Sequence, residues 1–525
     1  MSDKKPAKQP APKEEREWCL AEMGAPDARL YRCGRPIYEA PEGVDTEPLC
    51  LMHSRDPQKD DAAFQAEFER ILQAAGGGTA DFTGFVFPSS NYGGRAFKAR
   101  CDFKESTFNH RADFSDATFT QHVDFWGATF TQDADFHGAT FTQRAYFHLA
   151  TFIQGASFWG VMFAQDADFR QATFTQEAQF IDAVFAWDAS FFKATFSQDA
   201  SFCAATFSQR VNFSEAVFKG TVEFDKVRFR GEVEFREVVF RRDESREPGL
   251  IFSLARVEKP EAITFYKTYL GQALFHNCDV SRFVFSDVDW LKRANSKCMV
   301  FEESVGVERP AHAFAPLDQT YYAKALRPRK QDADERNYGL IAELYQQLKK
   351  NYDDRRDYWT AGDFHYGEME MKRLHSPSRN WLARRLHRHL GLMAWYNYAS
   401  EYGESYVPPF IWLVGVLLAF ALLAYPLVGL RYDPGKGASG ASSVATLTYM
   451  HACLASRGEP AAPCLTRWKL AGRSIMTALY VAAFQKDLVY EPSYPWGRLL
   501  ALLEVLLTST LIALFLLAVR RQFRR

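Results

Sequence analysis

The chain has 525 residues, enough for several domains. Its 63 Lys and Arg residues against 64 Asp and Glu residues leave a net charge of −1, which favours no particular class of partner. The sequence shows no nucleophile–base pair, no glycine-rich phosphate loop and no open metal site, so an enzyme is the least supported class of function.

The N-terminal residues 1–18 are rich in Lys, Glu and Pro and lack an apolar stretch. This composition predicts a disordered lead-in and no secretory signal.

The segment 19–56 contains four side chains that suit a tetrahedral zinc site: Cys19, Cys33, Cys50 and His53. Cys50 and His53 have the close spacing of a metal knuckle. A short segment with so few aliphatic residues would hardly fold without such a staple. We therefore expect a structural zinc site, with four protein ligands and no position for water. The alternative is a set of unrelated thiols in a reducing compartment, because the spacings match no strict zinc pattern.

A short helix is expected over residues 60–74, and Gly76, Gly77 and Gly78 lead from it into a repeat. From Phe103 to Phe240, phenylalanine occurs at 26 consecutive positions that are spaced alternately five and six residues apart. A small residue, usually Ala or Val, stands two places before each Phe. Because alternate side chains of a strand share a face, this pattern predicts very short strands with Phe and Ala inside a solenoid.

Four such units make a coil of 22 residues, as the alternation of five and six requires. The pattern resembles the pentapeptide-repeat family, in which four five-residue units form one square coil. The spacing is strictly five over Phe82–Phe97 and Phe265–Trp290, whereas the centre departs from the simplest family pattern. The resemblance implies a right-handed quadrilateral β-helix over residues 80–290.

The first half of the repeat is acidic, since residues 101–200 hold 13 Asp and Glu against 5 Lys and Arg, a net of −8. Some soluble pentapeptide-repeat proteins resemble duplex DNA and inhibit topoisomerases, so a DNA mimic is one interpretation. A solvated face is the other, because Asp suits these turns. We do not expect nucleic acid itself to be a partner.

After an irregular stretch over 291–333, residues 334–400 are expected to form a helical hairpin and a juxtamembrane helix. Five apolar residues of the first helix lie at helical spacing: Ile341, Leu344, Tyr345, Leu348 and Tyr352. The second helix has Tyr358, Ala361, Phe364, Met369 and Met371 as candidate apolar positions. The pair is similar to a tetratricopeptide-type hairpin, which implies protein contacts. His365 and Glu368 should be neighbours on an ordinary helix surface, with Glu370 turned away.

Residues 407–525 are expected to form a membrane domain with two spans, 410–430 and 499–519, each long enough to cross the hydrocarbon core of a bilayer. Arg384, Arg385 and Arg388 precede the first span, and four arginines follow the second. Both ends should therefore face the cytosol, and the resemblance implies a bacterial inner membrane. The loop 431–495 would lie outside, where Cys453 and Cys464 either pair or stay as two free thiols.

Within this loop, residues 474–484 are apolar but too short to span, which predicts a re-entrant segment. Two spans around such a segment resemble the pore module of two-transmembrane potassium channels. The glycine-containing filter is missing, so potassium selectivity is not expected. Gln485, Lys486 and Asp487 could line a pore mouth, and Glu504 could face either the bundle interior or the interface.

The whole arrangement resembles bacterial membrane-anchored pentapeptide-repeat proteins. We expect a non-enzymatic homo-oligomer in which the solenoid binds a protein partner or signal and a channel-like membrane domain responds. The alternatives are a scaffold whose spans only anchor it, and a DNA-mimic inhibitor of a topoisomerase.

Overall fold

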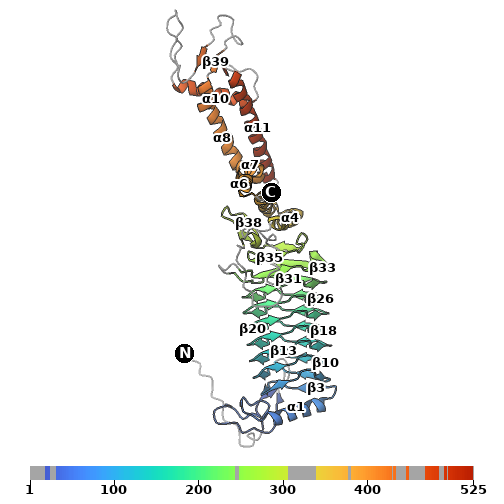
Figure 1. Cartoon of the computed structure of the whole chain (residues 1–525). Coiled ribbons are helices and arrows are strands. Elements are labelled where there is room, and N and C mark those ends of the chain that lie inside the picture. The colour runs from blue at the N-terminus through green and yellow to red at the C-terminus, as the bar shows by residue number, and fades with distance from the viewer. Residues whose placement is uncertain are drawn as a thin grey trace, which may run out of the picture. The chain divides into compact units, whose positions relative to one another are not determined.

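The computed structural model describes residues 18–23, 31–242, 247–304, 338–375, 380–428, 430–432, 445–447, 467–483, 490–492 and 495–523. The chain divides into two compact units, residues 1–337 and 338–525, and each is described by itself. The first unit is dominated by a β-solenoid of about nine turns (Figure 1).

The solenoid has four parallel sheets, which hold ten, seven, nine and eight strands. The first sheet contains β3 (Thr79–Asp81), β7 (Arg100–Asp102), β11 (Val123–Asp124), β15 (Ala145–Tyr146), β19 (Ala167–Asp168), β23 (Ala189–Ser190), β27 (Val211–Asn212), β31 (Val233–Arg236), β34 (Ile263–Tyr266) and β36 (Val284–Ser286). The second contains β4 (Val86–Phe87), β8 (Thr107–Phe108), β12 (Thr129–Phe130), β16 (Thr151–Phe152), β20 (Thr173–Phe174), β24 (Thr195–Phe196) and β28 (Val217–Phe218). The third contains β5 (Ser90–Asn91), β9 (Ala112–Asp113), β13 (Ala134–Asp135), β17 (Ala156–Ser157), β21 (Ala178–Gln179), β25 (Ala200–Ser201), β29 (Val222–Glu223), β32 (Leu250–Ser253) and β35 (Ala273–His276). The fourth contains β6 (Ala96–Phe97), β10 (Thr118–Phe119), β14 (Thr140–Phe141), β18 (Met162–Phe163), β22 (Val184–Phe185), β26 (Thr206–Phe207), β30 (Arg228–Phe229) and β33 (Arg256–Val257).

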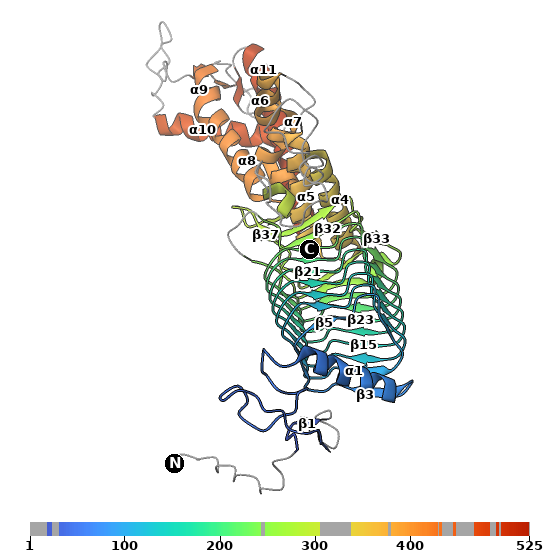
Figure 2. The same cartoon turned by 60° about the horizontal axis from the view of Figure 1, so that its bottom comes forward.

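The register of the sheets confirms the solenoid predicted from the repeat. In the centre each strand pairs with its equivalent in the next coil, for example Thr118 with Thr140 and Ala134 with Ala156. Near the C-terminal end, where the Phe spacing is strictly five, the coil is shorter and Thr264 pairs with Val284. Figure 2 shows the coils stacked on one another. The coil length therefore follows directly from the sequence period.

The interior is filled by columns of phenylalanine rings. Phe158 is fully buried, and its ring stacks on those of Phe136 and Phe180 at centroid distances of 5.0 and 4.8 Å. It meets Phe147 of a neighbouring column edge-on, at 5.5 Å and 88°. Offset stacks and edge-on contacts are the two arrangements that aromatic quadrupoles favour. The rings thus make favourable contacts both along the axis and across it.

The five-residue units and the six-residue units differ at their corners. In the five-residue units the chain makes a tight turn, such as Phe103–Ser106, closed by a hydrogen bond from the Ser106 N–H to the Phe103 carbonyl at 3.2 Å. Its third residue, Glu105, has a φ of 55°, as a type II turn requires. At most equivalent turn positions the residue with positive φ is not glycine. A backbone hydrogen bond to the next coil, such as that from the Glu105 N–H to the Trp126 carbonyl at 2.7 Å, stabilises this conformation.

Other elements cover the two ends of the solenoid. At the N-terminal end, α1 (Asp61–Ala75) begins after its capping residue Asp60 and packs Phe64 and Phe68 on the rings of the first coil. At the other end, the hairpin of β37 (Leu291–Lys292) and β38 (Cys298–Met299) leads to α2 (Phe301–Ser304). The prediction that the chain is irregular from residue 291 is therefore wrong up to residue 304. Residues 305–337 lie outside the described part of the chain.

The second unit is helical. It contains α4 (Tyr338–Asp354), α5 (Tyr358–Leu374), α6 (Trp381–Leu390), α7 (Leu392–Ser400), η3 (Glu401–Gly403), α8 (Val407–Ala419), η4 (Phe420–Ala424), α9 (Tyr425–Val428), α10 (Arg467–Ala482) and α11 (Pro495–Phe523). A small sheet joins β39 (Leu430–Tyr432), β40 (Ala445–Leu447) and β41 (Tyr490–Pro492). The five apolar residues predicted for the first hairpin helix are all buried in α4, whereas Tyr358 and Met369 of α5 are only half-buried.

The Phe columns give a direct test of the solenoid. Replacing the buried Phe158 by Ala should destabilise the surrounding coils by about 3–5 kcal/mol, because it opens a cavity in the stack. Replacing the exposed Trp187 by Ala should change stability by about 0.5 kcal/mol or less. Hydrogen exchange of the full chain should show faster exchange over residues 136–180 in the first variant only. Equal exchange in both variants would contradict the buried stack.

Candidate functional site

The four predicted metal ligands come together at the N-terminal side of the solenoid. A short antiparallel pairing of β1 (Glu22–Met23) with β2 (Tyr31–Arg32) brings Cys19 close to Cys33. The segment that follows makes a tight turn in which the N–H of His53 donates to the Cys50 carbonyl at 3.0 Å. This turn is the knuckle that the Cys50–His53 spacing predicts.

The ligand atoms of the cluster all lie within 4.8 Å of one another. The Sγ atoms of Cys33 and Cys50 are 3.7 Å apart, and His53 Nδ1 lies 3.2 Å from Cys50 Sγ and 3.7 Å from Cys19 Sγ. A tetrahedron with metal–sulfur bonds of roughly 2.3 Å has sulfur–sulfur edges of about 3.8 Å. The Cys33–Cys50 distance fits such an edge and is far too long for a disulfide. The cluster can therefore hold a tetrahedral metal ion.

Neighbouring groups orient and charge the cluster. His53 Nε2 lies 3.0 Å from the Thr83 carbonyl oxygen, an arrangement in which a proton on Nε2 leaves Nδ1 free as a ligand. Hydrogen bonds with Cys19 and Cys50 lower the pKa of Cys33, and the Arg35 guanidinium donates to its Sγ at 3.2 Å. The thiolate is the form that binds metals.

The cluster also fastens the N-terminal segment to the first coil. The His53 ring meets Phe85 edge-on at 5.1 Å, and Arg35 lies over the same ring while pairing with Glu67 of α1 at 3.2 Å. Lys59 is almost fully buried and donates to the carbonyls of Leu51 and Ser54 at 2.9 Å, and also to the Val86 carbonyl. Burial lowers the pKa of Lys59 to about 8. Sequence reasoning did not single out Arg35 and Lys59, because nothing in the sequence distinguishes them from other basic residues.

A shallow groove lies on the outer face of the first sheet of the solenoid. Its volume is about 340 Å³, and Tyr146, Arg170 and Asn212 are among the residues that line it. Charged residues of both signs surround it, including an ion pair of Arg144 with Asp166 at 2.9 Å. Trp187, which is 53% exposed, precedes the lining residue Asp188. Exposed aromatic residues and arginines are typical of the centres of protein interfaces.

In the hairpin, His365 Nδ1 lies 3.8 Å from Glu368, as predicted. Glu368 is buried, so the prediction that it lies on an ordinary helix surface is wrong, and Glu370 binds Arg373 and Tyr402 instead. Glu368 pairs with Lys372 at 2.6 Å and with Lys349 at 3.4 Å. Burial opposes its ionisation, but the neighbouring His365, the hydrogen bond from Lys372 and the charge of Lys349 lower its pKa to about 2. This is a structural ion-pair network that joins α4 to α5.

Glu370 belongs to a polar junction between the hairpin and the long helices. The Tyr402 hydroxyl donates to Glu370 at 2.8 Å, and Arg373 pairs with the same carboxylate. Arg521, near the end of α11, donates to the Tyr402 carbonyl at 3.2 Å and to Glu404 at 2.7 Å. Glu401 and Tyr402 both have left-handed backbone angles, with φ of 47° and 61°, which is costly for residues other than glycine. The surrounding contacts hold this conformation in place.

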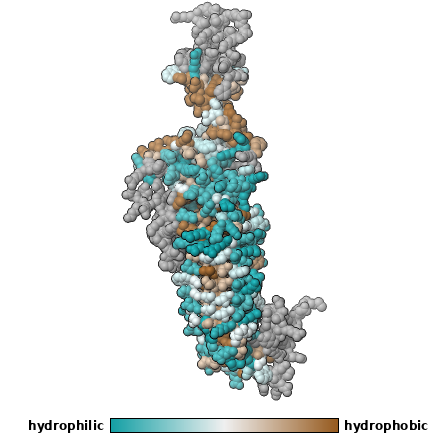
Figure 3. Space-filling view, turned by 90° about the vertical axis from the view of Figure 1, so that its right-hand side faces the viewer, coloured by the Kyte–Doolittle hydropathy of each residue, from teal (hydrophilic) through white to brown (hydrophobic). Residues whose placement is uncertain are grey.

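Two helical segments are long and apolar enough to cross a membrane: Val407–Leu427 and Trp496–Phe523. The most apolar 18 residues of each segment have a mean hydropathy of 2.4. Only 17% of that stretch is buried in the first segment and 22% in the second. They begin three residues earlier than predicted in each case. In the space-filling view, hydrophobic residues gather over this unit, while the visible solenoid face is mostly hydrophilic (Figure 3).

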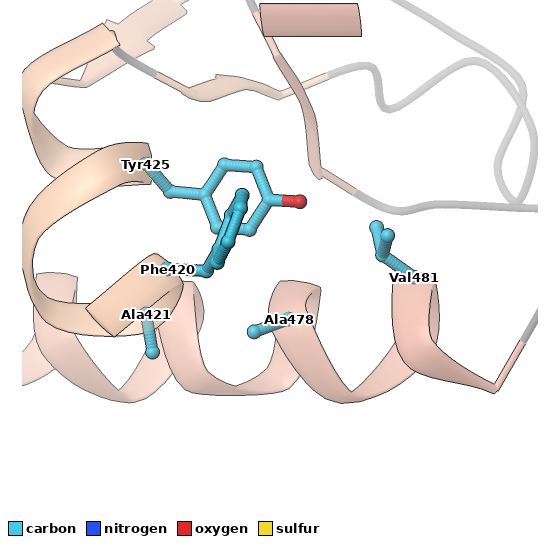
Figure 4. Packing of buried hydrophobic residues seen from close by; sticks show 5 residues of the cluster. All are labelled: Phe420, Ala421, Tyr425, Ala478 and Val481. Carbon is cyan, nitrogen blue, oxygen red and sulfur yellow. The ribbon is translucent and has the colours of Figure 1, made fainter. Parts of the chain in front are cut away.

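The short apolar segment predicted over 474–484 falls mostly in α10, which begins earlier, at Arg467, and ends at Ala482. Ala478 and Val481 of α10 pack against Phe420, Ala421 and Tyr425, as Figure 4 shows. The π-helical turn η4 lies at this contact, just before Pro426, whose missing N–H cannot continue the α-helical hydrogen bonds.

Glu504 faces the interior of this bundle. Its side chain is fully buried, and the Tyr425 hydroxyl donates to one of its oxygens. The other oxygen, and the hydroxyl of the buried Ser474, have no hydrogen-bond partner among the described residues. Of the two positions predicted for Glu504, the structure has the interior one. Gln485, Lys486, Asp487, Cys453 and Cys464 lie outside the described residues, so the pore-mouth and disulfide predictions stay predictions.

The sequence matches the family described as Pentapeptide repeats (9 copies) at residues 125–173 and 204–245. No curated protein and no solved structure matches the chain significantly. Both matched stretches fall between the first and the last strand of the solenoid, β3 and β36. The chain therefore contains a solenoid of pentapeptide repeats.

Proposed function

We propose that this protein is a non-enzymatic integral membrane protein, in which the pentapeptide-repeat solenoid is a scaffold for a protein partner and the helical unit contains two membrane spans. The observation that carries the proposal is the pair of long, exposed apolar helices Val407–Leu427 and Trp496–Phe523. The junction of Glu370, Tyr402 and Arg521 ties the hairpin of α4 and α5 to the end of the second of these helices.

Membrane insertion is supported by the exposure of the two apolar helices. A soluble protein rarely leaves long apolar faces uncovered, whereas lipid is a good solvent for them. Arg385 precedes the first segment, and Arg520 and Arg521 lie at the end of the second. Basic residues at these places favour a cytosolic position for the start of the first segment and the end of the second.

Partner binding is supported by the groove of Arg144, Tyr146 and Arg170, with Trp187 beside it. Its three arginines and three aspartates cancel in charge, so recognition would depend on shape and specific hydrogen bonds. The arginines on this face also interrupt any continuous negative surface. This arrangement favours a scaffold over a mimic of duplex DNA.

The metal of the cluster is zinc in this proposal, because three thiolates and one imidazole in a tetrahedron are a typical zinc donor set. Its role is structural, since the four protein ligands fill the coordination sphere. The ion would stabilise the N-terminal segment against the first coil of the solenoid.

Purified protein should contain about one zinc ion per chain. A Cys33→Ser/Cys50→Ser variant should lose the zinc and expose the segment around Trp18 to proteases, as elemental analysis and limited proteolysis would show. Cys203→Ser, which removes a buried thiol of the solenoid, is the matched control and should keep the metal. Zinc content unchanged in the double variant would contradict the site.

The junction predicts that changes at α11 reach the hairpin. Arg521→Gln should speed hydrogen exchange in α5 and η3 in detergent, because Tyr402 and Glu404 lose their donor. Arg520→Gln, one residue away at an exposed position, should leave exchange unchanged. If both variants behave alike, the junction does not couple these elements.

The spans are channel-like in this proposal, as part of a homo-oligomer without potassium selectivity. It is supported by the packing of the short helix α10 between the two apolar helices and by the buried Glu504. The competing proposal is that the spans only anchor the scaffold.

Ion flux across membranes of cells that express the chain distinguishes the two. The full chain should raise the flux, and a chimera in which an unrelated two-span anchor replaces residues 407–525 should not. Equal fluxes for the full chain and the chimera would contradict a pore. A chimera that keeps the full biological function would show that the spans only anchor the scaffold.

A further inference from the structure

The helix α6 carries an apolar stripe that the described part of the chain covers only by about half. Leu382, Leu386 and Leu390 recur every four residues and so share one face of the helix. Each is between 48% and 60% exposed. Leu392 and Trp395 of α7 extend the exposed apolar surface. Three exposed leucines in a row on a ten-residue helix need an apolar environment.

The arginine edge of α6 is the one that packs on the protein. Arg388 donates to the Leu374 carbonyl at 3.2 Å, and its guanidinium lies 5.7 Å from the Tyr338 ring centre. Arg373 in turn donates to the Arg388 carbonyl. Helical geometry places Arg384 and Arg388 opposite the leucines. A helix on a soluble core would do the reverse and bury its leucines.

The flanks of the leucine stripe are basic. Arg385 and His389 lie on one side and His387 on the other, and all three are exposed. The helix contains no acidic residue, and Trp381 at its start is 63% exposed. An apolar stripe with cationic flanks and a terminal Trp is the pattern of helices that lie in the membrane interface.

The place of α6 in the chain fits the same surface. It is followed by α7, which contacts both α8 and α11, the helices of the proposed spans. The first apolar segment begins at Val407, shortly after Leu390 in the chain, so α6 is held close to any membrane that these helices enter.

We propose that α6 lies on the membrane surface, with Leu382, Leu386 and Leu390 in the headgroup–acyl boundary and its basic flanks on anionic lipid headgroups. The inference rests on the proposed insertion of the two spans. It adds a second membrane contact beside them, and one with lipid specificity.

Photocrosslinking of the full chain in nanodiscs tests this contact. Benzoylphenylalanine placed at Leu386 should form adducts with lipid, and the same residue at the exposed Gln346 of α4 should not. A third position, Leu506 in the second apolar helix, reports on insertion itself. A lipid adduct at Leu506 but not at Leu386 would overturn the inference and leave the spans intact. A crosslink from Leu386 to a second copy of the chain would also overturn it, and no adduct at Leu506 would refute the proposed function.

The lipid preference is measured in the same system. Nanodiscs with phosphatidylglycerol should give several-fold more adduct at Leu386 than nanodiscs of phosphatidylcholine alone. Arg385→Gln should reduce this preference by about five-fold, as expected for one cationic side chain near an anionic surface. Arg228→Gln, at an exposed position of the solenoid, should leave it unchanged. Equal adduct in both lipids would remove the anionic specificity from the proposal.

Discussion

Stacking of phenylalanine rings at a fixed coil length is the constraint on which the first unit depends. A ring such as Phe158 contacts its equivalents one coil above and below, so each coil is stable only when its neighbours have the same length. The period of the repeat sets that length, and the alternating corners are its consequence. The Phe columns leave the outward residues free to vary, and this freedom permits the groove and the exposed Trp187 on an otherwise repetitive surface.

A solenoid stabilised only by neighbour contacts has two open ends, and both are covered. Phe64 and Phe68 of α1 continue the ring packing at one end, and the cluster of three cysteines and His53 fastens the preceding segment beside it. At the other end Glu302 is buried and accepts a hydrogen bond from the Phe275 N–H, and burial raises its pKa to about 8. The cluster is thus best understood as part of the end cover rather than as a reactive centre.

The second unit is not stabilised by a buried apolar core in the same way, since its two long helices leave most of their apolar surface exposed. Specific polar contacts join its elements, among them Glu370 with Tyr402, Arg521 with Glu404, and Tyr425 with Glu504. In apolar surroundings such contacts fix which helix faces meet, because each unsatisfied partner is costly. Together with the exposed leucines of α6, they fit the proposed contact of this unit with lipid at more than one depth.

The sequence by itself determined the solenoid, its coil length, the hairpin and the two apolar segments. Each depends on a local feature of the chain, a residue period or a long apolar stretch, that can be recognised without knowledge of the fold. It also indicated the four candidate metal ligands by their chemistry, although their spacing matched no strict pattern. Tertiary structure alone decided that Cys19 and Cys33 meet the Cys50–His53 turn, since a hairpin and the first coil bring distant segments together. It likewise decided that Glu504 faces inward and that α6 exposes its leucines, because the side of a helix that is covered depends on neighbours far away in the chain.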